Sequence, residues 1–243
     1  IAHPYSTSNN VYLRAMFKRP YDPQKLSPEP GSSDTRVGDD ILSLVGGIAD
    51  SIGAAVPVVV NQLFKDVAKV QSGFTQTPRN IFGDSTVYHI KKGGASVELG
   101  VPVSQAKAAV DAVFACVQSS VFAGFVGIRF VKNTKATIGF TRFAPLTCTI
   151  ELPAVNSEAT HNFYKKVFAE LDNLNIPFTL HWGQEGDYSP QRLSRMYGAM
   201  LDKWIQARKK FLPDSVQRYM FTNDFLKRCG INEAAPLTGG TII

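Results

Sequence analysis

Several patterns that would assign a function directly are missing from this chain of 243 residues. Its three cysteines form no CxxC pair and no zinc-ligand spacing, which excludes a disulfide framework and favours a reducing compartment such as the cytoplasm. No group of histidine, cysteine and aspartate residues has the spacing of metal ligands. A glycine-rich loop that could hold a dinucleotide pyrophosphate is also missing, so we expect the chain alone to bind a dinucleotide weakly or not at all.

Uninterrupted apolar runs are scarce as well. Residues 41–70 are apolar enough to suggest a transmembrane helix, but Asp50, several glycines and Pro57 interrupt them. Two packed helices divided near Pro57 are the preferred interpretation. The net charge is +6, but the basic residues are scattered and have no interleaved aromatic residues. We therefore expect no membrane span and no nucleic-acid partner.

The N-terminal part has the composition of a linker. Residues 1–35 contain five prolines and a polar Gly-Ser-Ser-Asp stretch, which is typical of irregular chain. The chain begins with Ile1 rather than Met, so we expect further residues upstream. Residues 1–85 are expected to form this lead-in followed by a helical segment, and a short strand is expected at 86–90.

Regular patterning begins at residue 96. Strands are expected at 96–101, 125–131, 136–143, 146–152 and 177–182. Helices are expected after Ser104 and Ser157, which are good N-cap residues followed by apolar side chains at helical spacing. This order predicts an α+β domain over 86–184, an antiparallel sheet with helices on one face, in a ferredoxin-like or split βαβ arrangement with an extra hairpin.

Alternation is strict in the strand expected at 146–152. Leu146, Cys148, Ile150 and Leu152 face one side, and Thr147, Thr149 and Glu151 face the other. A helical tail is expected over 185–243. Its long helix should span 190–210, with Ser189 as N-cap and Pro190 at the first helical position.

The segment 178–184, Phe-Thr-Leu-His-Trp-Gly-Gln, is the most informative in the chain. Its His181–Gln184 part resembles the His-Trp-Gly-Lys signature of FAD-linked oxidases of the vanillyl-alcohol oxidase type, which include sugar-lactone and alditol oxidases and a covalent-flavin cholesterol oxidase. Trp204, Arg208 and residues 221–226 resemble that family's closing pattern, and residues 127–131 resemble its Glu-x-Arg-Phe strand. The resemblance covers roughly residues 86–230.

This resemblance implies a two-part flavoprotein. An upstream domain of the same polypeptide would bind FAD, and this chain would be the substrate-binding cap domain, with the tail completing the flavin-facing side. The implied activity is that of an FAD-dependent oxidoreductase acting on CH-OH groups of a small-molecule substrate, and this chain alone would be inactive. Gly127 stands where relatives carry Glu, and Gln184 stands where they carry Lys. An alcohol less polar than a polyol, or another redox substrate, fits these two departures.

Five side chains are the candidates for the site. Arg129 lies in a strand with two apolar faces, so it needs a partner, either a carboxylate such as Glu151 or the flavin and substrate. Glu151 is a candidate general base if its face roofs a cavity, and otherwise faces solvent. The resemblance assigns His181, Gln184 and Asn223 to the cofactor, although Asn223 can equally cap a turn.

We expect Arg129, Glu151, His181 and Gln184 to line one wall of a cavity on the side of the flavin domain. Two alternatives stay open. A non-catalytic ligand-binding module that retains the cap fold is favoured by the two departures from the family pattern. A basic interaction domain would instead bind nucleic acid in a salt-sensitive manner.

Overall fold

The computed structural model describes residues 2–6, 11, 13, 19–26, 39–68 and 93–231, without the side chains of 39–44 and 63–68. The strand expected at 86–90 and most of the expected lead-in lie outside these residues. The chain divides into two compact units. Unit 1 comprises Ile1–Val97, Val110–Ile128 and Glu151–Glu170, and unit 2 comprises Glu98–Ala109, Arg129–Ile150 and Leu171–Ile243.

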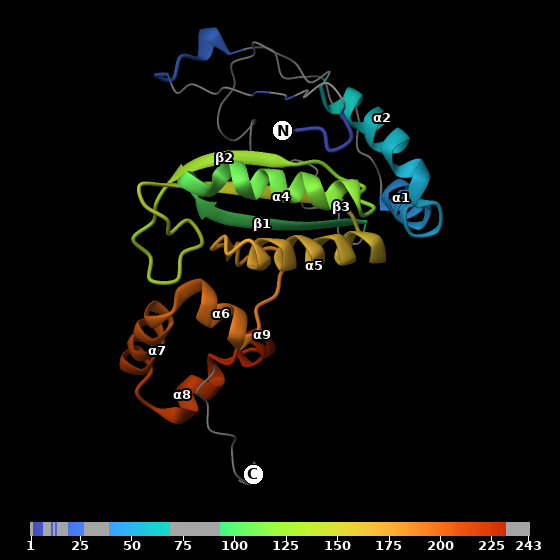
Figure 1. Ribbon diagram of the computed structural model, residues 1–243. Helices are drawn as coiled ribbons and strands as arrows, with labels where there is room; N and C mark the ends of the chain where they lie inside the picture. Colours follow the sequence, from blue (N-terminus) through green and yellow to red (C-terminus); the bar gives the residue numbers. More distant parts are fainter. Residues whose placement is uncertain are drawn as a thin grey trace. The chain divides into compact units, whose positions relative to one another are not determined.

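A four-stranded sheet is the centre of the fold (Figure 1). Its strands are β1 (Gly94–Pro102), β2 (Gly127–Lys132), β3 (Leu146–Val155) and β4 (Thr179–Leu180), in the order β2-β3-β1-β4. Helix α4 (Ala106–Gln118) connects β1 to β2, and α5 (Glu158–Asn173) connects β3 to β4. Each connection therefore skips one strand, which is the split βαβ arrangement. The predicted α+β class with an antiparallel sheet is confirmed.

The remaining elements are helical. They are η1 (Pro23–Lys25), α1 (Asp39–Ser51), η2 (Gly53–Ala55), α2 (Val56–Ala68), η4 (Val103–Gln105), α6 (Pro190–Tyr197), α7 (Ala199–Phe211), α8 (Ser215–Met220) and α9 (Asp224–Arg228). Pro57 lies in the first turn of α2, where its missing N–H breaks no helical hydrogen bond, so the expected division near Pro57 is confirmed. None of the helices in the described ranges is long and apolar enough to cross a membrane.

The core of unit 1 forms where apolar faces of strands and helices meet. Val97 of β1 and Leu152 of β3 are buried, as are Val113 of α4 and Val167 of α5. Phe122 and Phe163 stack with ring centroids 4.2 Å apart. A second cluster joins α1 and α2 to the end of β3, and it contains Val45, Ala49, Val56, Val60, Ala123 and Val155. Helical and strand periodicity thus supply matching apolar faces.

Helix α5 begins where the sequence predicts. The hydroxyl of Ser157 accepts a hydrogen bond from the N–H of Thr160 at 3.1 Å, which confirms the expected N-cap. The Asp50 carboxylate accepts from the N–H groups of Glu158 and Ala159, at 3.3 Å and 2.8 Å. The first N–H groups of α5 therefore have acceptors from two parts of unit 1.

Two helix predictions are wrong in detail. Ser104 is not the N-cap of α4, because it lies inside η4, which follows Pro102 and delays the start of α4 to Ala106. The single helix expected over 190–210 is two helices, α6 and α7. Gly198 separates them with a φ of 50°, a conformation that side chains other than glycine rarely adopt. Ser189 does cap α6, since its hydroxyl accepts from the N–H of Arg192 at 3.3 Å.

The strand expected at 136–143 is also wrong, because residues 133–145 form a loop in unit 2. The carbonyl oxygen of Phe140 accepts a hydrogen bond from the Thr179 hydroxyl. A Cβ atom on Gly100 would lie 2.6 Å from the same oxygen. The loop therefore lies over the sheet face that carries Gly100 and Thr179, and the glycine permits this close approach.

Candidate functional site

The end of β4 places His181 beside a buried carboxylate of β1. Leu99 lies opposite Leu180 in the antiparallel pairing of these strands. The next residue along β4, His181, donates its N–H to the carbonyl of Glu98 at 3.0 Å. His181 and Glu98 are therefore neighbours across the two strands, and their side chains share one face of the sheet.

Strand β3 adds a threonine to this face. At one end of the β1–β3 pair, the Asn156 N–H donates to the Gly93 carbonyl at 2.9 Å. At the other end, Thr147 Cγ2 lies 3.1 Å from where a Cβ on Gly100 would be. The two strands therefore run antiparallel, and Thr147 and Thr149 lie on the same face of the sheet as Gly100 and Glu98.

Strand β2 completes a row of side chains across the sheet. The Asn133 N–H donates to the Pro145 carbonyl at 3.4 Å, which fixes the register of the β2–β3 pair. Followed back along the two antiparallel strands, this register puts Arg129 opposite Thr149. All four members of the row belong to unit 2, and we call them the polar row: Arg129, Thr149, Glu98 and His181.

Arg129 and Glu98 form an ion pair across the polar row. Nη1 of Arg129 lies 2.6 Å from Oε1 of Glu98, and the side chains are 53% and 8% exposed, respectively. Since β3 lies between β2 and β1, the arginine side chain must cross over β3 to make this contact. An unpaired carboxylate is costly to bury, and the pairing offsets that cost. Glu98 is thus a partner of Arg129, and the pairing of Arg129 with Glu151 that the sequence suggests stays a prediction.

The two buried threonines of β3 differ in their hydrogen bonds. The Thr147 hydroxyl accepts from the N–H of Phe143 at 3.1 Å and donates to the carbonyl of the same residue at 3.2 Å. The Thr149 hydroxyl is also buried, but it has no hydrogen-bond partner among the described residues. A buried hydroxyl without a partner costs about 1–3 kcal/mol, so Thr149 is an unusual feature of a sheet interior.

His181 presents a hydrogen-bond donor. Its Nδ1 accepts from the N–H of Gly183 at 3.1 Å, so the neutral ring carries its proton on Nε2. The ring lies edge-on to Phe140, with centroids 4.6 Å apart. The His181 carbonyl accepts from the N–H of Gln184 at 3.1 Å and from the hydroxyl of Tyr188. These contacts hold the ring and the following turn in place.

The other predicted site residues are Glu151, Asn223 and Gln184. Glu151 belongs to unit 1. A Cβ atom added to Gly127 would lie 3.4 Å from the Cβ of Glu151. Asn223 is exposed and caps α9, because its Oδ1 accepts from the N–H of Leu226 at 2.9 Å. Gln184 is half-buried in the turn after His181. That Glu151 and Gln184 line one cavity wall with the polar row stays a prediction.

Trp182 enters an aromatic cluster of unit 2. Its ring stacks between Tyr188 and Tyr197, with centroid distances of 5.4 Å and 5.8 Å, and Phe225 meets it edge-on at 6.1 Å. The indole Nε1–H donates to the carbonyl of Ile138 at 2.8 Å. Burial raises the pKa of Tyr197 to about 12 and also raises the pKa of Tyr188, so both phenols are neutral at physiological pH.

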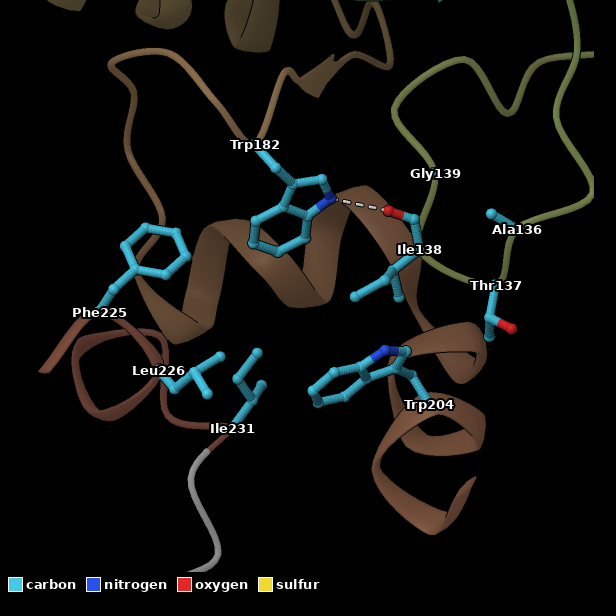
Figure 2. A pocket seen from close by; sticks show the side chains of 9 residues that line it. All are labelled: Ala136, Thr137, Ile138, Gly139, Trp182, Trp204, Phe225, Leu226 and Ile231. Carbon is cyan, nitrogen blue, oxygen red and sulfur yellow. Dashed lines mark hydrogen bonds between the residues drawn. The ribbon is translucent and has the colours of Figure 1, made fainter. Parts of the chain in front are cut away.

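An apolar hollow opens beside this cluster, with a volume of about 440 Å³. Figure 2 shows the nine side chains that line it, with Trp204 and Trp182 on facing sides. The lining residues are Ala136, Thr137, Ile138, Gly139, Trp182, Trp204, Phe225, Leu226 and Ile231. None of them is ionisable. The hollow can therefore hold an apolar group but cannot supply an acid or a base.

The closing part of the chain is held by Arg208 of α7. Its Nη2 donates to the carbonyls of Arg218 and Phe221, at 3.0 Å and 3.2 Å, and to the Thr222 hydroxyl at 2.7 Å. The guanidinium thus ties the end of α8 to α7. This contact fixes the turn before Asn223. The Arg and the Phe-Thr-Asn sequence of the closing pattern therefore belong to one hydrogen-bonded structure.

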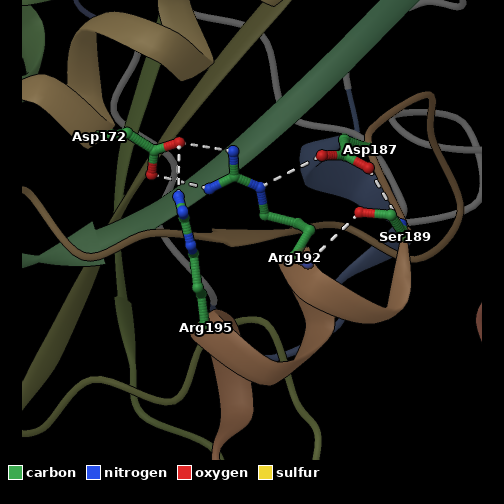
Figure 3. Close-up of polar contacts among 5 residues, drawn as sticks. All are labelled: Asp172, Asp187, Ser189, Arg192 and Arg195. Carbon is green, nitrogen blue, oxygen red and sulfur yellow. Dashed lines mark hydrogen bonds and ion pairs between the residues drawn. The ribbon is translucent and has the colours of Figure 1, made fainter.

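An ion cluster joins the end of α5 to α6 (Figure 3). Arg192 donates two hydrogen bonds to the Asp172 carboxylate, at 2.8 Å and 2.7 Å, and Arg195 lies 3.2 Å from the same group. Hydrogen bonding from Arg192 lowers the pKa of Asp172. The Arg192 guanidinium also lies over the Phe178 ring, 4.6 Å from its centroid. The cluster anchors α6 and the turn that precedes it.

Comparison with known proteins leaves the family open. No protein-family model matches the chain, and no curated protein matches it. Within 2–6, 19–26, 39–68 and 93–231, no group of three or more His, Cys, Asp or Glu residues could hold a metal ion. All three cysteines are buried free thiols, as expected for Cys116 and Cys148.

Sequence reasoning missed Glu98, although a signal for it existed. Glu98 is the one charged residue in the apolar strand expected at 96–101, and an isolated carboxylate in such a strand needs a buried partner. The apolar hollow was missed because two of its segments, at 136–139 and at Ile231, come from regions that had no correct structural prediction.

Proposed function

We propose that the chain is the substrate-binding cap of an FAD-dependent oxidoreductase that oxidises an alcohol-like substrate. The observation that carries this proposal is that segments behind the family resemblance, far apart in the sequence, pack together in unit 2. Phe225 of the closing pattern lies against Trp182 of the His-Trp-Gly turn, and Arg208 fixes the chain between them. Arg129, from the Arg-Phe strand, shares the polar row with His181.

The residues present fit one part of the flavin. His181 Nε2–H and the Gln184 amide are neutral donors suited to an electron-rich ring edge. The pyrophosphate has no such fit, because Asp187 lies beside the first turn of α6 and would repel it. When bound, FAD supplies the acceptor for a hydride from a substrate carbon. The flavin-binding domain of the same polypeptide and a small-molecule substrate are therefore the proposed partners.

The chain's own residues would bind and orient the substrate. Arg129, half-exposed at the edge of the polar row, would hold the substrate oxygen, and a nearby carboxylate would take its proton. Glu151 is the carboxylate assigned from the sequence. His181, Gln184 and Asn223 would lie on the cofactor side.

Purification of the native polypeptide that contains this chain tests the proposal. We expect a yellow protein whose flavin absorbance is bleached by one or more members of a panel of primary and secondary alcohols under anaerobic conditions. Arg129→Ala should slow bleaching about a hundredfold, and Lys132→Ala, a change of an exposed cation on the same strand, should not. A polypeptide without flavin, or one that no alcohol reduces, would remove the proposal.

The isolated chain provides a second measurement. We expect it to be colourless and to quench the fluorescence of added FAD only weakly, because it lacks a pyrophosphate-binding loop. Tight stoichiometric binding by this chain alone would contradict the division of roles between cap and flavin domain.

A non-catalytic ligand-binding module is the second candidate. The observation in its favour is the hollow, whose nine lining residues include no ionisable side chain. Gly127 and Gln184 also replace charged residues of the family pattern. This candidate predicts an apolar ligand that binds beside Trp182 and Trp204 and quenches their fluorescence, without any turnover in the native polypeptide.

A further inference from the structure

The polar row contains more hydrogen-bonding capacity than the described residues use. Oε1 of Glu98 accepts from Arg129, and Oε2 of the same carboxylate is a second acceptor. The Thr149 hydroxyl is buried without a partner. His181 uses Nδ1 within its own turn, which leaves its Nε2–H as a further donor. An acceptor, a hydroxyl and a donor thus occur together on three adjacent strands.

Burial gives this group a fixed geometry. Glu98 is 6% exposed and Thr149 is 1% exposed, so neither side chain samples many rotamers. Phe140 packs against the His181 ring on one side. Arg129 is the half-exposed edge of the row, so the row borders solvent at the arginine side chain.

Charge restricts the ligand that fits. Glu98 and Arg129 already neutralise each other, so the row offers no net charge to a phosphate, a carboxylate or an amine. A neutral hydroxyl group matches it better, since its O–H donates to the carboxylate while its oxygen accepts from Thr149 or His181.

We propose that Glu98, paired with Arg129, binds the hydroxyl group of a neutral alcohol on this face of the sheet, with Thr149 and His181 completing the hydrogen bonds. The inference deepens the proposed function, on which it rests for the reaction. It also names Glu98, rather than Glu151, as the carboxylate that meets the substrate. The binding step itself needs only residues of this chain.

Benzyl alcohol and benzyl methyl ether are the probes, because they differ in the O–H donor that Glu98 would accept. In an NMR titration of the chain, benzyl alcohol should shift the amide signals of Glu98, Thr149 and His181. It should bind about tenfold more tightly than the ether, as a hydrogen bond to a charged acceptor would give. Glu98→Gln should reduce this preference about tenfold.

Matched variants keep the test decisive. Glu158→Gln, at an exposed position of α5, should leave the preference unchanged. Thr149→Val keeps the side-chain shape and removes only an unpartnered hydroxyl, so it should fold and weaken alcohol binding several-fold. If Glu98→Gln does not fold, the alcohol affinity of Thr149→Val provides the test on its own. Equal affinity for both probes, shifts confined to other surfaces, or unchanged binding in both variants would overturn the inference.

The two proposals fail in different ways. Alcohol binding at the polar row in a native polypeptide that contains no flavin would remove the proposed function and keep this inference. Flavin reduction by alcohols that Glu98→Gln leaves unchanged in both KM and kcat would keep the function and remove Glu98 from it.

Discussion

His181 and Trp182 are consecutive in the chain but enter opposite chemical surroundings. His181 faces the polar row and lies beside a buried carboxylate, whereas Trp182 stacks between two tyrosines next to an apolar hollow. Alternation at the end of a strand is enough to separate them. One short segment can therefore place a polar side chain on one face of the sheet and an aromatic anchor on the other.

The loop at 133–145 connects these two surroundings. Its Phe140 carbonyl accepts from Thr179 on the polar face, and its Ile138 carbonyl accepts from the Trp182 indole. Arg142 of the same loop donates to the Met196 carbonyl of α6. The loop therefore couples the sheet of unit 2 to its helices. Substitutions of His181 and of Trp182 should differ in their effect on the free energy of unfolding.

The largest expected effect is on stability and comes from the Trp182 side. Trp182→Ala removes three ring contacts and the indole hydrogen bond, so it should lower the free energy of unfolding by about 3–5 kcal/mol. His181→Ala should cost much less, because the imidazole makes one ring contact and one local hydrogen bond. Urea denaturation of both variants measures the difference. Equal losses would show that the two sides of the boundary do not differ in role.

The ion cluster that anchors α6 should give the next largest effect. Asp172→Asn leaves Arg192 with 10% side-chain exposure and without its bidentate partner, which should cost about 2 kcal/mol at neutral pH. The folded-state pKa of Asp172 is lowered, so its contribution is present above the unfolded-state pKa and is lost as the pH falls through the folded value.

Thermal unfolding at a series of acidic pH values tests this dependence. The wild-type protein should lose more stability than Asp172→Asn between neutral pH and about pH 3, because the variant has already lost the pair. Asp202→Asn, at an exposed position of α7, is the control and should follow the wild type. Parallel curves for Asp172→Asn and the wild type would contradict the assigned role of the cluster.

A smaller effect is expected at the bend between α6 and α7. Gly198 has a φ of 50° and a ψ of −131°, so Gly198→Ala should cost about 1–2 kcal/mol through backbone strain. Gly47 offers a matched control, because it lies within α1 and a Cβ there would contact nothing within 4 Å. Gly47→Ala should leave stability unchanged or raise it by about 0.5–1 kcal/mol. Equal melting temperatures for the two variants would show that the bend is not strained.

Sequence periodicity was sufficient where one pattern had one interpretation. The alternation of residues 146–152 predicts β3 correctly, and the N-caps Ser157 and Ser189 predict the starts of α5 and α6, because each depends on local chemistry. The polar face of β3 was expected to face solvent or a cavity. Thr147 is instead buried under a loop, which no local pattern encodes.

Contacts between residues far apart in the sequence explain the features that could not be predicted. The segment 136–143 has residues suited to a strand, but its backbone groups bond to side chains of the sheet and of Trp182 instead of to a neighbouring strand. The ion pair between Arg129 and Glu98 could not be predicted either, since Glu98 lies two strands away across β3. Of the predicted site residues, Arg129 and His181 share the polar row, while Asn223 has a local cap to explain it.

The smallest expected effect compares the two threonines of β3. Thr147→Val removes a hydroxyl that bonds to both backbone groups of Phe143, so it should lower the free energy of unfolding by about 1–2 kcal/mol. Thr149→Val removes a buried hydroxyl without a partner among the described residues, so stability should stay constant or rise by about 1 kcal/mol. Both changes keep the shape of the side chain, so packing differences cancel. Guanidinium denaturation distinguishes the two outcomes, and a loss at Thr149 equal to that at Thr147 would mean that the Thr149 hydroxyl already has a partner. In that case Thr149 would not be available to a ligand, and the polar row would keep only Glu98 and His181 for binding.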